Sequence, residues 1–169
     1  MGTYIRKHSH DNLITELIKT EAELFGFDAI GIAKPRKLTK QAVHLESWLG
    51  AGNQNGLDYL KRNAEKLINP SEIMSDVRSI IVVIMNYYPA YKQNPKSDYK
   101  IAKYAYGKDY HVIFKERLEL LANFIENATG TADTKIFIDS GTVLEKNWAV
   151  KAGLGWQGKH SLVINPDIG

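Results

Sequence analysis

Apolar residues recur at helical spacing in several stretches of this chain. Leu13, Leu17, Ala22 and Phe25 share one face of a predicted amphipathic helix over residues 11–25, with Asp11 as its N-cap and Gly26 at its end. The same spacing predicts further helices over residues 39–49, 57–64, 111–128 and 142–152, the third of these capped by Asp109.

Short apolar runs separate these helices. Ser79–Tyr87 (SIIVVIMNY) is continuous and rich in β-branched residues, which predicts a strand buried on both faces. Shorter strands are predicted over residues 27–33, 99–106, 135–138 and 161–164. The alternation predicts an α/β (α+β) fold in which a mixed sheet of about four to five strands carries helices on both faces.

A length of 169 residues predicts a single domain over 1–169. The chain ends at Gly169 directly after a predicted strand, and we expect this point to lie within a longer protein. No apolar run approaches the roughly 18 residues of a membrane span, and the polar N-terminus has no signal-peptide core. We therefore expect a cytoplasmic protein without a membrane partner.

Composition excludes several kinds of site. The chain has no cysteine, so it cannot itself hold disulfides, thiolate zinc sites or cysteine-ligated iron–sulfur clusters. His111 has no second histidine at metal-binding spacing, and we predict no metal site. The net charge of +3 permits an anionic partner without requiring one.

Three stretches could carry chemistry. Asp139 follows the predicted strand 135–138, where a carboxylic acid could donate a proton, although Asp139–Gly141 is also typical of a helix cap. Gly153, Gly155 and Gly158 match the dinucleotide fingerprint in letters, but they follow a helix and precede a strand, which excludes that site. A glycine-rich ligand loop and a plain helix C-terminal turn both remain open there.

The third stretch, Lys103–His111, mixes tyrosines with lysines around Gly107. Such a mixture suits stacking on bases together with phosphate contacts. Lysines that extend from a strand end are the simpler interpretation, and the residues alone favour it.

Four segments together resemble the epoxyqueuosine reductase family. They are GFDAIGIA at 26–33, residues 56–70 with VRSIIVVIMNYYP at 77–89, IAKYAYGKDYH at 101–111, and FIDSGTVLEKNWAVKAGLGWQGKHSLVINPDIG at 137–169. The resemblance covers nearly the whole chain, which corresponds to the N-terminal catalytic portion of such an enzyme.

The resemblance implies a cobalamin-dependent oxidoreductase that converts epoxyqueuosine to queuosine in the anticodon loop of tRNA. It implies a core like that of nitroreductases and reductive dehalogenases, and two [4Fe-4S] clusters in a downstream ferredoxin-like region absent here. Asp139 matches the family's proton donor. By position, the cobalamin-binding residues are Leu67, Ala102, Lys159 and Val163.

The chain departs from the family pattern at several positions. Leu67 stands where the family usually has arginine, and Gln157 and His160 replace isoleucine and asparagine. Without cluster cysteines, we expect the chain alone to be inactive, and we expect a monomer. The alternatives are a non-catalytic corrinoid- or flavin-binding module, and a reductive-dehalogenase-like reductase of another substrate.

Overall fold

The computed structural model describes residues 8–139 and 141–168, and these fall into two compact units. The first unit contains residues 8–30, 83–138 and Ile168, and the second contains residues 31–82, 139 and 141–167. The two units alternate along the chain, so neither is a contiguous domain. The predicted single domain over 1–169 stays a prediction.

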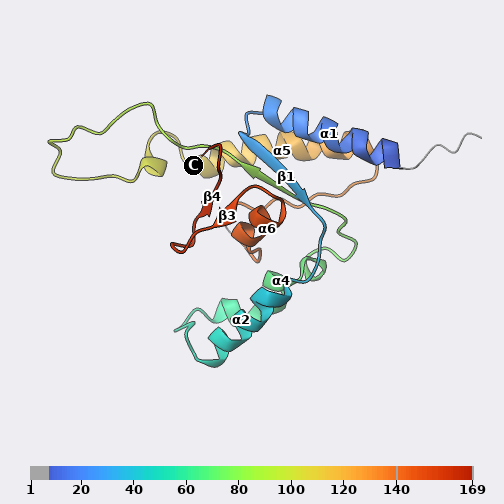
Figure 1. The fold of residues 1–169 in the computed structure, drawn as a ribbon, viewed down its shortest axis with the longest axis horizontal. Helices are drawn as coiled ribbons and strands as arrows, with labels where there is room; N and C mark the ends of the chain where they lie inside the picture. The colour runs from blue at the N-terminus through green and yellow to red at the C-terminus, as the bar shows by residue number, and fades with distance from the viewer. Residues whose placement is uncertain (1–7, 140, 169) are drawn as a thin grey trace, which may run out of the picture. The chain divides into compact units, whose positions relative to one another are not determined.

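Two long helices build the first unit. α1 (His8–Leu24) packs along α5 (Tyr110–Thr129), and the two lie side by side in Figure 1. Ile18 and Ala22 of α1 and Leu121 of α5 are buried. Both helices confirm the periodicity of the sequence. Asp11 is not the N-cap that we predicted, because α1 already begins at His8.

The ends of these helices follow ordinary capping chemistry. The Asp109 side chain caps α5 by accepting a hydrogen bond from the backbone N–H of His111 at 2.9 Å, as predicted. Gly26 follows α1 with φ +85°, and the Arg117 guanidinium of α5 donates to its carbonyl at 2.5 Å. A Cβ at residue 26 would lie 2.8 Å from that guanidinium, so both the backbone conformation and the contact favour glycine.

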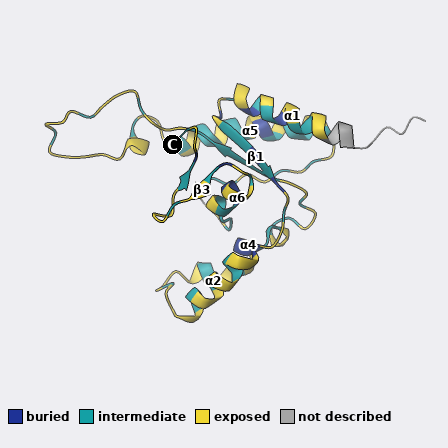
Figure 2. Cartoon of the chain, in the orientation of Figure 1, coloured by how far each residue is buried: buried dark blue, intermediate teal, exposed yellow. Residues whose placement is uncertain are grey.

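The second unit is built from short helices around a small core. Ala33, Leu38, Leu67, Ile68 and Trp148 form its buried cluster. α2 packs on α4 but has no buried residue, and Figure 2 shows its surface as mostly exposed. The helical elements are α2 (Thr39–Gly50), α3 (Asp58–Arg62), α4 (Ala64–Ile68), the 3₁₀ turn η1 (Pro70–Glu72) and α6 (Glu145–Lys151).

The strands of the described residues form two small sheets. β1 (Ala29–Ala33) pairs with β2 (Ile80–Ile84), and β3 (Trp156–Gln157) pairs antiparallel with β4 (Val163–Ile164). Helices combined with small sheets confirm the α/β (α+β) class. In residues 8–139 and 141–168, no helix has the length and apolar character that crossing a bilayer requires.

Two of the predicted strands are wrong, so the expected four to five strands do not form one sheet in the described residues. Residues 99–106 form an irregular loop with the 3₁₀ turn η2 (Lys103–Ala105), and residues 135–138 are also irregular. Residues 99–105 are all exposed, so their alternating pattern has no apolar face to bury. Lys135 and Ile136 are exposed too, and a segment without a paired neighbour or a buried face gains little from strand geometry.

Other predicted elements exist with different limits. β2 covers only the centre of Ser79–Tyr87 and is half-buried throughout, because β1 is the one strand beside it in the described sheet. The helix predicted over 57–64 is divided into α3 and α4 at Asn63, and the helix predicted over 142–152 begins only at Glu145.

We predict that Trp148→Ala lowers the free energy of unfolding by about 3–5 kcal/mol, since it removes the largest side chain of the second unit's core. Trp156→Ala is the matched control. Trp156 is 52% exposed, and its removal is expected to change stability by less than about 0.5 kcal/mol. Urea denaturation of both variants measures the difference. Equal costs for the two variants would contradict the assignment of Trp148 as the core residue.

Candidate active site

The second unit positions most of the predicted site residues around α6. Trp148 and Ala149 are 3% and 6% exposed, so this short helix is fixed to the core by its inner face. β3 and β4 both pack against α6, and Leu67 belongs to the same buried cluster as Trp148. The segments that carry Asp139, Lys159 and Val163 therefore all adjoin one helix or its contacts.

Asp139 lies in an exposed turn ahead of this helix. Its φ is +48°, in the left-handed region that aspartate and asparagine tolerate better than most residues, and Gly141 has φ +114°. Ser140, which follows Asp139 in the sequence, lies outside the described residues. The structure therefore leaves the predicted proton donor exposed to solvent.

The alternative interpretation of Asp139 as a helix cap is wrong. α6 begins at Glu145, its N-cap is Leu144, and no side chain caps it. Asp139 thus lies too far ahead of the helix to satisfy its first N–H groups. The strand predicted directly before Asp139 is also absent from the described residues. The position of this turn therefore depends on a contact other than strand pairing.

Glu145 holds the turn of Asp139 to α6. It is half-buried in the first turn of α6, and its carboxylate accepts a hydrogen bond from the backbone of Asp139. Burial raises the pKa of the Glu145 carboxyl, and the nearby charge of Asp139 raises it further. The hydrogen bond from Asp139 and the charge of Lys146 act on this pKa in the opposite direction. The site is therefore a pair of carboxyl groups, one exposed and one half-buried.

Sequence reasoning missed Glu145 as a site residue. It appeared only as one residue of the segment 137–169, which resembles the family's pattern. The available signal was an acidic residue at the start of a helix, shortly after a candidate acid. That signal is weak by itself, because acidic residues are common in first helical turns.

The β3–β4 hairpin carries Lys159 and Val163. Trp156 pairs with Ile164 and Gln157 with Val163, and the turn closes with a hydrogen bond from the N–H of Gly158 to the carbonyl of Leu162 at 2.9 Å. Lys159 is exposed in that turn, and Val163 is half-buried in β4. Trp156 and Leu162 are 52% and 56% exposed, so the hairpin presents apolar surface beside a cation.

The glycines before the hairpin have a structural use. Gly153 has φ +79° in the turn after α6, which confirms a helix C-terminal turn there. Gly155 has φ +143°, and a Cβ on it would overlap the carbonyl group of Ile164. Close approach of these two backbones brings β4 against the end of α6. A ligand contact by the same stretch stays a prediction.

The remaining predicted residues lie in different surroundings. Leu67 is 8% exposed and packs in the core of the second unit, so its side chain offers no polar group to a ligand. Ala102 belongs to the first unit, where it is exposed immediately before η2. The predicted residues therefore divide into a group around α6 and one residue in the loop of the other unit.

Comparison with known proteins shows similarity along most of the chain. The family model described as "Epoxyqueuosine reductase QueG, DUF1730" matches residues 68–140, a segment that ends just after Asp139. An epoxyqueuosine reductase of Cellulophaga algicola is 42% identical over 92% of this chain, and that of Escherichia coli is 34% identical over 94%. Over nearly its whole length, the chain is similar to epoxyqueuosine reductases.

Solved structures of this family share the fold. Epoxyqueuosine reductase from Streptococcus thermophilus matches 92% of the chain with a TM-score of 0.81 and 27% identity. A crystal structure of an epoxyqueuosine reductase with an epoxyqueuosine-modified tRNA stem loop matches 94% with a TM-score of 0.76 and 24% identity. The chain spans about half the length of the curated relatives, covering 50% of the Cellulophaga algicola protein and 43% of each of these structures' chains.

We predict that Glu145→Gln changes how stability depends on pH. The folded-state pKa of Glu145 lies above its ordinary value of 4.5, so its contribution to stability is present below that value and disappears as pH rises through the folded pKa. Glutamine cannot ionise, but it still accepts the hydrogen bond from Asp139. The variant should therefore gain stability relative to the parent as the pH is raised from about 4 to about 7, measured by urea denaturation at both values.

The control for this experiment is the Asp139→Asn background. The charge of Asp139 is the second cause of the raised pKa of Glu145, so the pH-dependent gain from Glu145→Gln should shrink when that charge is removed. A relative decrease in the variant's stability on raising the pH would contradict the direction of the shift.

Proposed function

We propose that this chain carries the proton donor and part of the cobalamin site of an enzyme that reduces epoxyqueuosine to queuosine in tRNA. We further propose that it acts in the cytoplasm and as a monomer. The observation that carries the proposal is the turn of Asp139, which caps no helix and is fixed to α6 through Glu145. The similarity to epoxyqueuosine reductases supports this choice of substrate.

The chemistry needs an acid at this position. Epoxyqueuosine loses its epoxide oxygen as water and gains a carbon–carbon double bond, so the reaction consumes a pair of electrons and a pair of protons. An alkoxide is a poor leaving group, and proton transfer to the oxygen from a positioned acid lowers the barrier. Asp139 is exposed in the turn ahead of α6, and we propose that its carboxyl group delivers that proton.

Glu145 would act as the positioning residue for this step. Its carboxylate accepts a backbone hydrogen bond from Asp139, and its own backbone belongs to a helix with a buried inner face. Fixing the turn in this way reduces the number of conformations in which the acid faces away from the substrate. Holding a catalytic group in its reactive geometry before the substrate binds supplies much of the rate acceleration that the group gives.

The hairpin residues suit a large macrocyclic cofactor. Cobalamin has a broad, partly apolar ring with amide side chains at its rim, and the exposed Trp156 and Leu162 offer apolar surface beside Lys159. We propose that Lys159 and Val163 hold the cofactor, with the apolar surroundings of Leu67 contributing. The cobalamin contact assigned to Ala102 by the family resemblance stays a prediction. When bound, cobalamin supplies the cobalt centre through which electrons reach the substrate carbon.

Electrons would have to arrive from elsewhere. Iron–sulfur clusters of the [4Fe-4S] type are held by cysteine thiolates, and this sequence contains no cysteine. We propose that two such clusters lie in a part of the functional enzyme that this sequence does not include.

Asp139→Asn tests the proposed acid. The chain is joined to the part of the Cellulophaga algicola relative that it does not match, so that the protein spans that relative's full length. Asparagine tolerates the left-handed φ of +48° as aspartate does, so the turn should survive while the acid is removed. We expect turnover of epoxyqueuosine tRNA to fall by about 10²–10⁴-fold, with cobalamin binding and melting temperature unchanged.

Unchanged turnover in Asp139→Asn, with cobalamin bound, would remove Asp139 from the mechanism. Glu145→Gln and Glu145→Ala form a matched pair in the same protein. The glutamine keeps the acceptor for the backbone of Asp139 and should retain most of the turnover, whereas alanine removes it and should lower kcat with little change in KM.

The isolated chain should not turn over epoxyqueuosine tRNA with ferredoxin-type or chemical reductants at physiological potentials. It has no ligands for an electron relay. Mass spectrometry of the digested nucleosides measures how much of the tRNA epoxide disappears. Multiple turnovers by the 169-residue chain alone would contradict the proposal that the relay lies elsewhere.

A further inference from the structure

One loop of the first unit has a composition unlike the rest of the chain. Residues 87–108, which we call the tyrosine–lysine loop, contain six of the nine tyrosines, five lysines and a single acidic residue, Asp98. Its net charge of +4 exceeds that of the whole chain, which is +3. Most of these tyrosines are exposed, with Tyr91 and Tyr99 at 84% and 80%. Tyrosines this exposed contribute little to a core, so their concentration beside lysines calls for another explanation.

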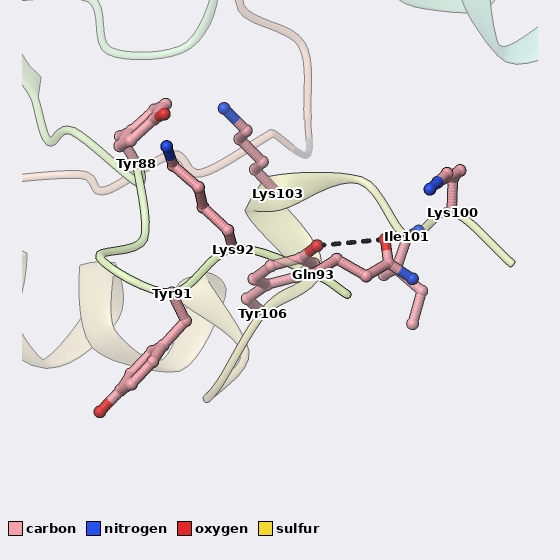
Figure 3. Close-up of a pocket in the computed structure, with 8 residues that line it drawn as sticks. All are labelled: Tyr88, Tyr91, Lys92, Gln93, Lys100, Ile101, Lys103 and Tyr106. Atoms are coloured by element: carbon pink, nitrogen blue, oxygen red, sulfur yellow. Dashed lines mark hydrogen bonds between the residues drawn. The ribbon is translucent and has the colours of Figure 1, made fainter. Parts of the chain in front are cut away.

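The loop encloses an open pocket of about 300 Å³, shown in Figure 3. Lys92 and Lys103 extend their amines to the same side of it, and the Lys103 amine lies 3.8 Å from the centre of the Tyr88 ring. The described residues that line the pocket include no acid. They are Tyr88, Tyr91, Lys92, Gln93, Lys100, Ile101, Lys103 and Tyr106.

Gln93 fixes the shape of this pocket. Its side-chain oxygen accepts hydrogen bonds from the backbone N–H of Ile101 at 3.1 Å and from the hydroxyl of Tyr106 at 3.3 Å. Its side-chain amide donates to the carbonyl of Tyr99. One residue thus connects both sides of the loop, so the pocket walls are formed before any ligand arrives.

A series of aromatic rings ties the loop to α5. Tyr87 meets Tyr104 edge-on at 6.5 Å, and Tyr104 meets Tyr110 in the same way at 6.2 Å. Tyr110 contacts Phe114, which contacts the buried Phe27. The exposed part of the loop is therefore connected through ring contacts to the core of the first unit.

We propose that the tyrosine–lysine loop is a binding surface for single-stranded RNA. Bases stack on its exposed tyrosine rings, and backbone phosphates contact Lys92 and Lys100. The inference deepens the proposed function and rests on it for the identity of the RNA, which is the unpaired anticodon loop of the substrate tRNA. Aromatic faces and cations interleaved almost without acidic residues match the chemistry of such a strand, because every base has a face that stacks and every nucleotide carries a negative charge.

A surface that bound RNA through its lysines alone would not account for the exposed tyrosines. Lysines alone attract duplex and single strand alike, whereas stacking needs unpaired bases. Lysines that merely extend from a strand end are excluded for residues 99–106, because no strand forms there. The experiment therefore has to separate stacking from charge.

The probe is a fluorescein-labelled RNA hairpin with an unpaired loop, titrated with the 169-residue chain and followed by fluorescence anisotropy. No modified nucleoside, cofactor or reductant is needed. Tyr91→Ala should weaken binding roughly 5- to 100-fold, the range typical of removing one base stack. Lys92→Gln combined with Lys100→Gln should lower the slope of log K against log salt by about 0.7 for each phosphate that the variant no longer neutralises.

Matched controls come from the second unit. Tyr59→Ala removes a tyrosine that is 49% exposed, and Lys40→Gln with Lys61→Gln removes the same charge from α2 and α3. These controls should bind as the parent does. Gln93→Ala should weaken binding without removing any group that touches the RNA, because it releases the pocket walls.

The outcomes separate the two proposals. Equal affinity for the hairpin and for the same RNA annealed to its complement, or equal weakening in the loop variants and the controls, would overturn the RNA surface and leave the acid assignment of Asp139 standing. Tyr91-dependent hairpin binding, together with unchanged turnover in Asp139→Asn, would support the surface and overturn the proposed mechanism instead.

Discussion

The burial of Trp148 is the interaction on which the second unit depends. α6 is seven residues long and has no side-chain N-cap, so it would not persist as an isolated helix. Trp148 and Ala149 hold it to a core that also contains Leu38 and Leu67. Once α6 is fixed, its first turn fixes Asp139 through Glu145, and its end fixes β4 through the close approach of Gly155 and Ile164. A single buried indole therefore sets the position of the exposed acid.

The sequence predicted the helices well, because apolar spacing directly reports which face is buried. α1, α2 and α5 appear close to their predicted limits, and Asp109 caps α5. The strands over 99–106 and 135–138 were wrong for the opposite reason. A strand needs a partner, and alternation along one segment says nothing about whether a second segment lies beside it. The exposed tyrosines of 99–106 alternate along the sequence as they would in a strand. In the structure, the Gln93 side chain instead forms hydrogen bonds with the backbone of this segment and with the Tyr106 hydroxyl.

In the candidate site too, the sequence predicted one residue and missed the tertiary contact that positions it. Asp139 was identified from its motif, yet neither the strand before it nor the capping role expected of it is present in the described residues. Glu145 was passed over because an acid in a first helical turn is ordinary. What gives it a role is its half-buried position and its contact with the Asp139 backbone, neither of which is encoded locally. The family resemblance pointed to Asp139 as a candidate acid, and the tertiary structure shows its contact with Glu145.

In the first unit, the tyrosine–lysine loop is exposed and yet held in a defined conformation by side-chain contacts. Edge-on ring contacts run from Tyr87 through Tyr104 and Tyr110 toward the buried Phe27, and Gln93 closes the loop on itself. Each contact lowers the conformational entropy that a ligand would otherwise have to remove on binding. Because the outer tyrosines are exposed, their rings contribute no hydrophobic burial to the stability of the fold. A flat ligand that stacks on these rings would bury them. Rigid attachment and high exposure in the same side chains are what distinguish a recognition surface from an unstructured loop.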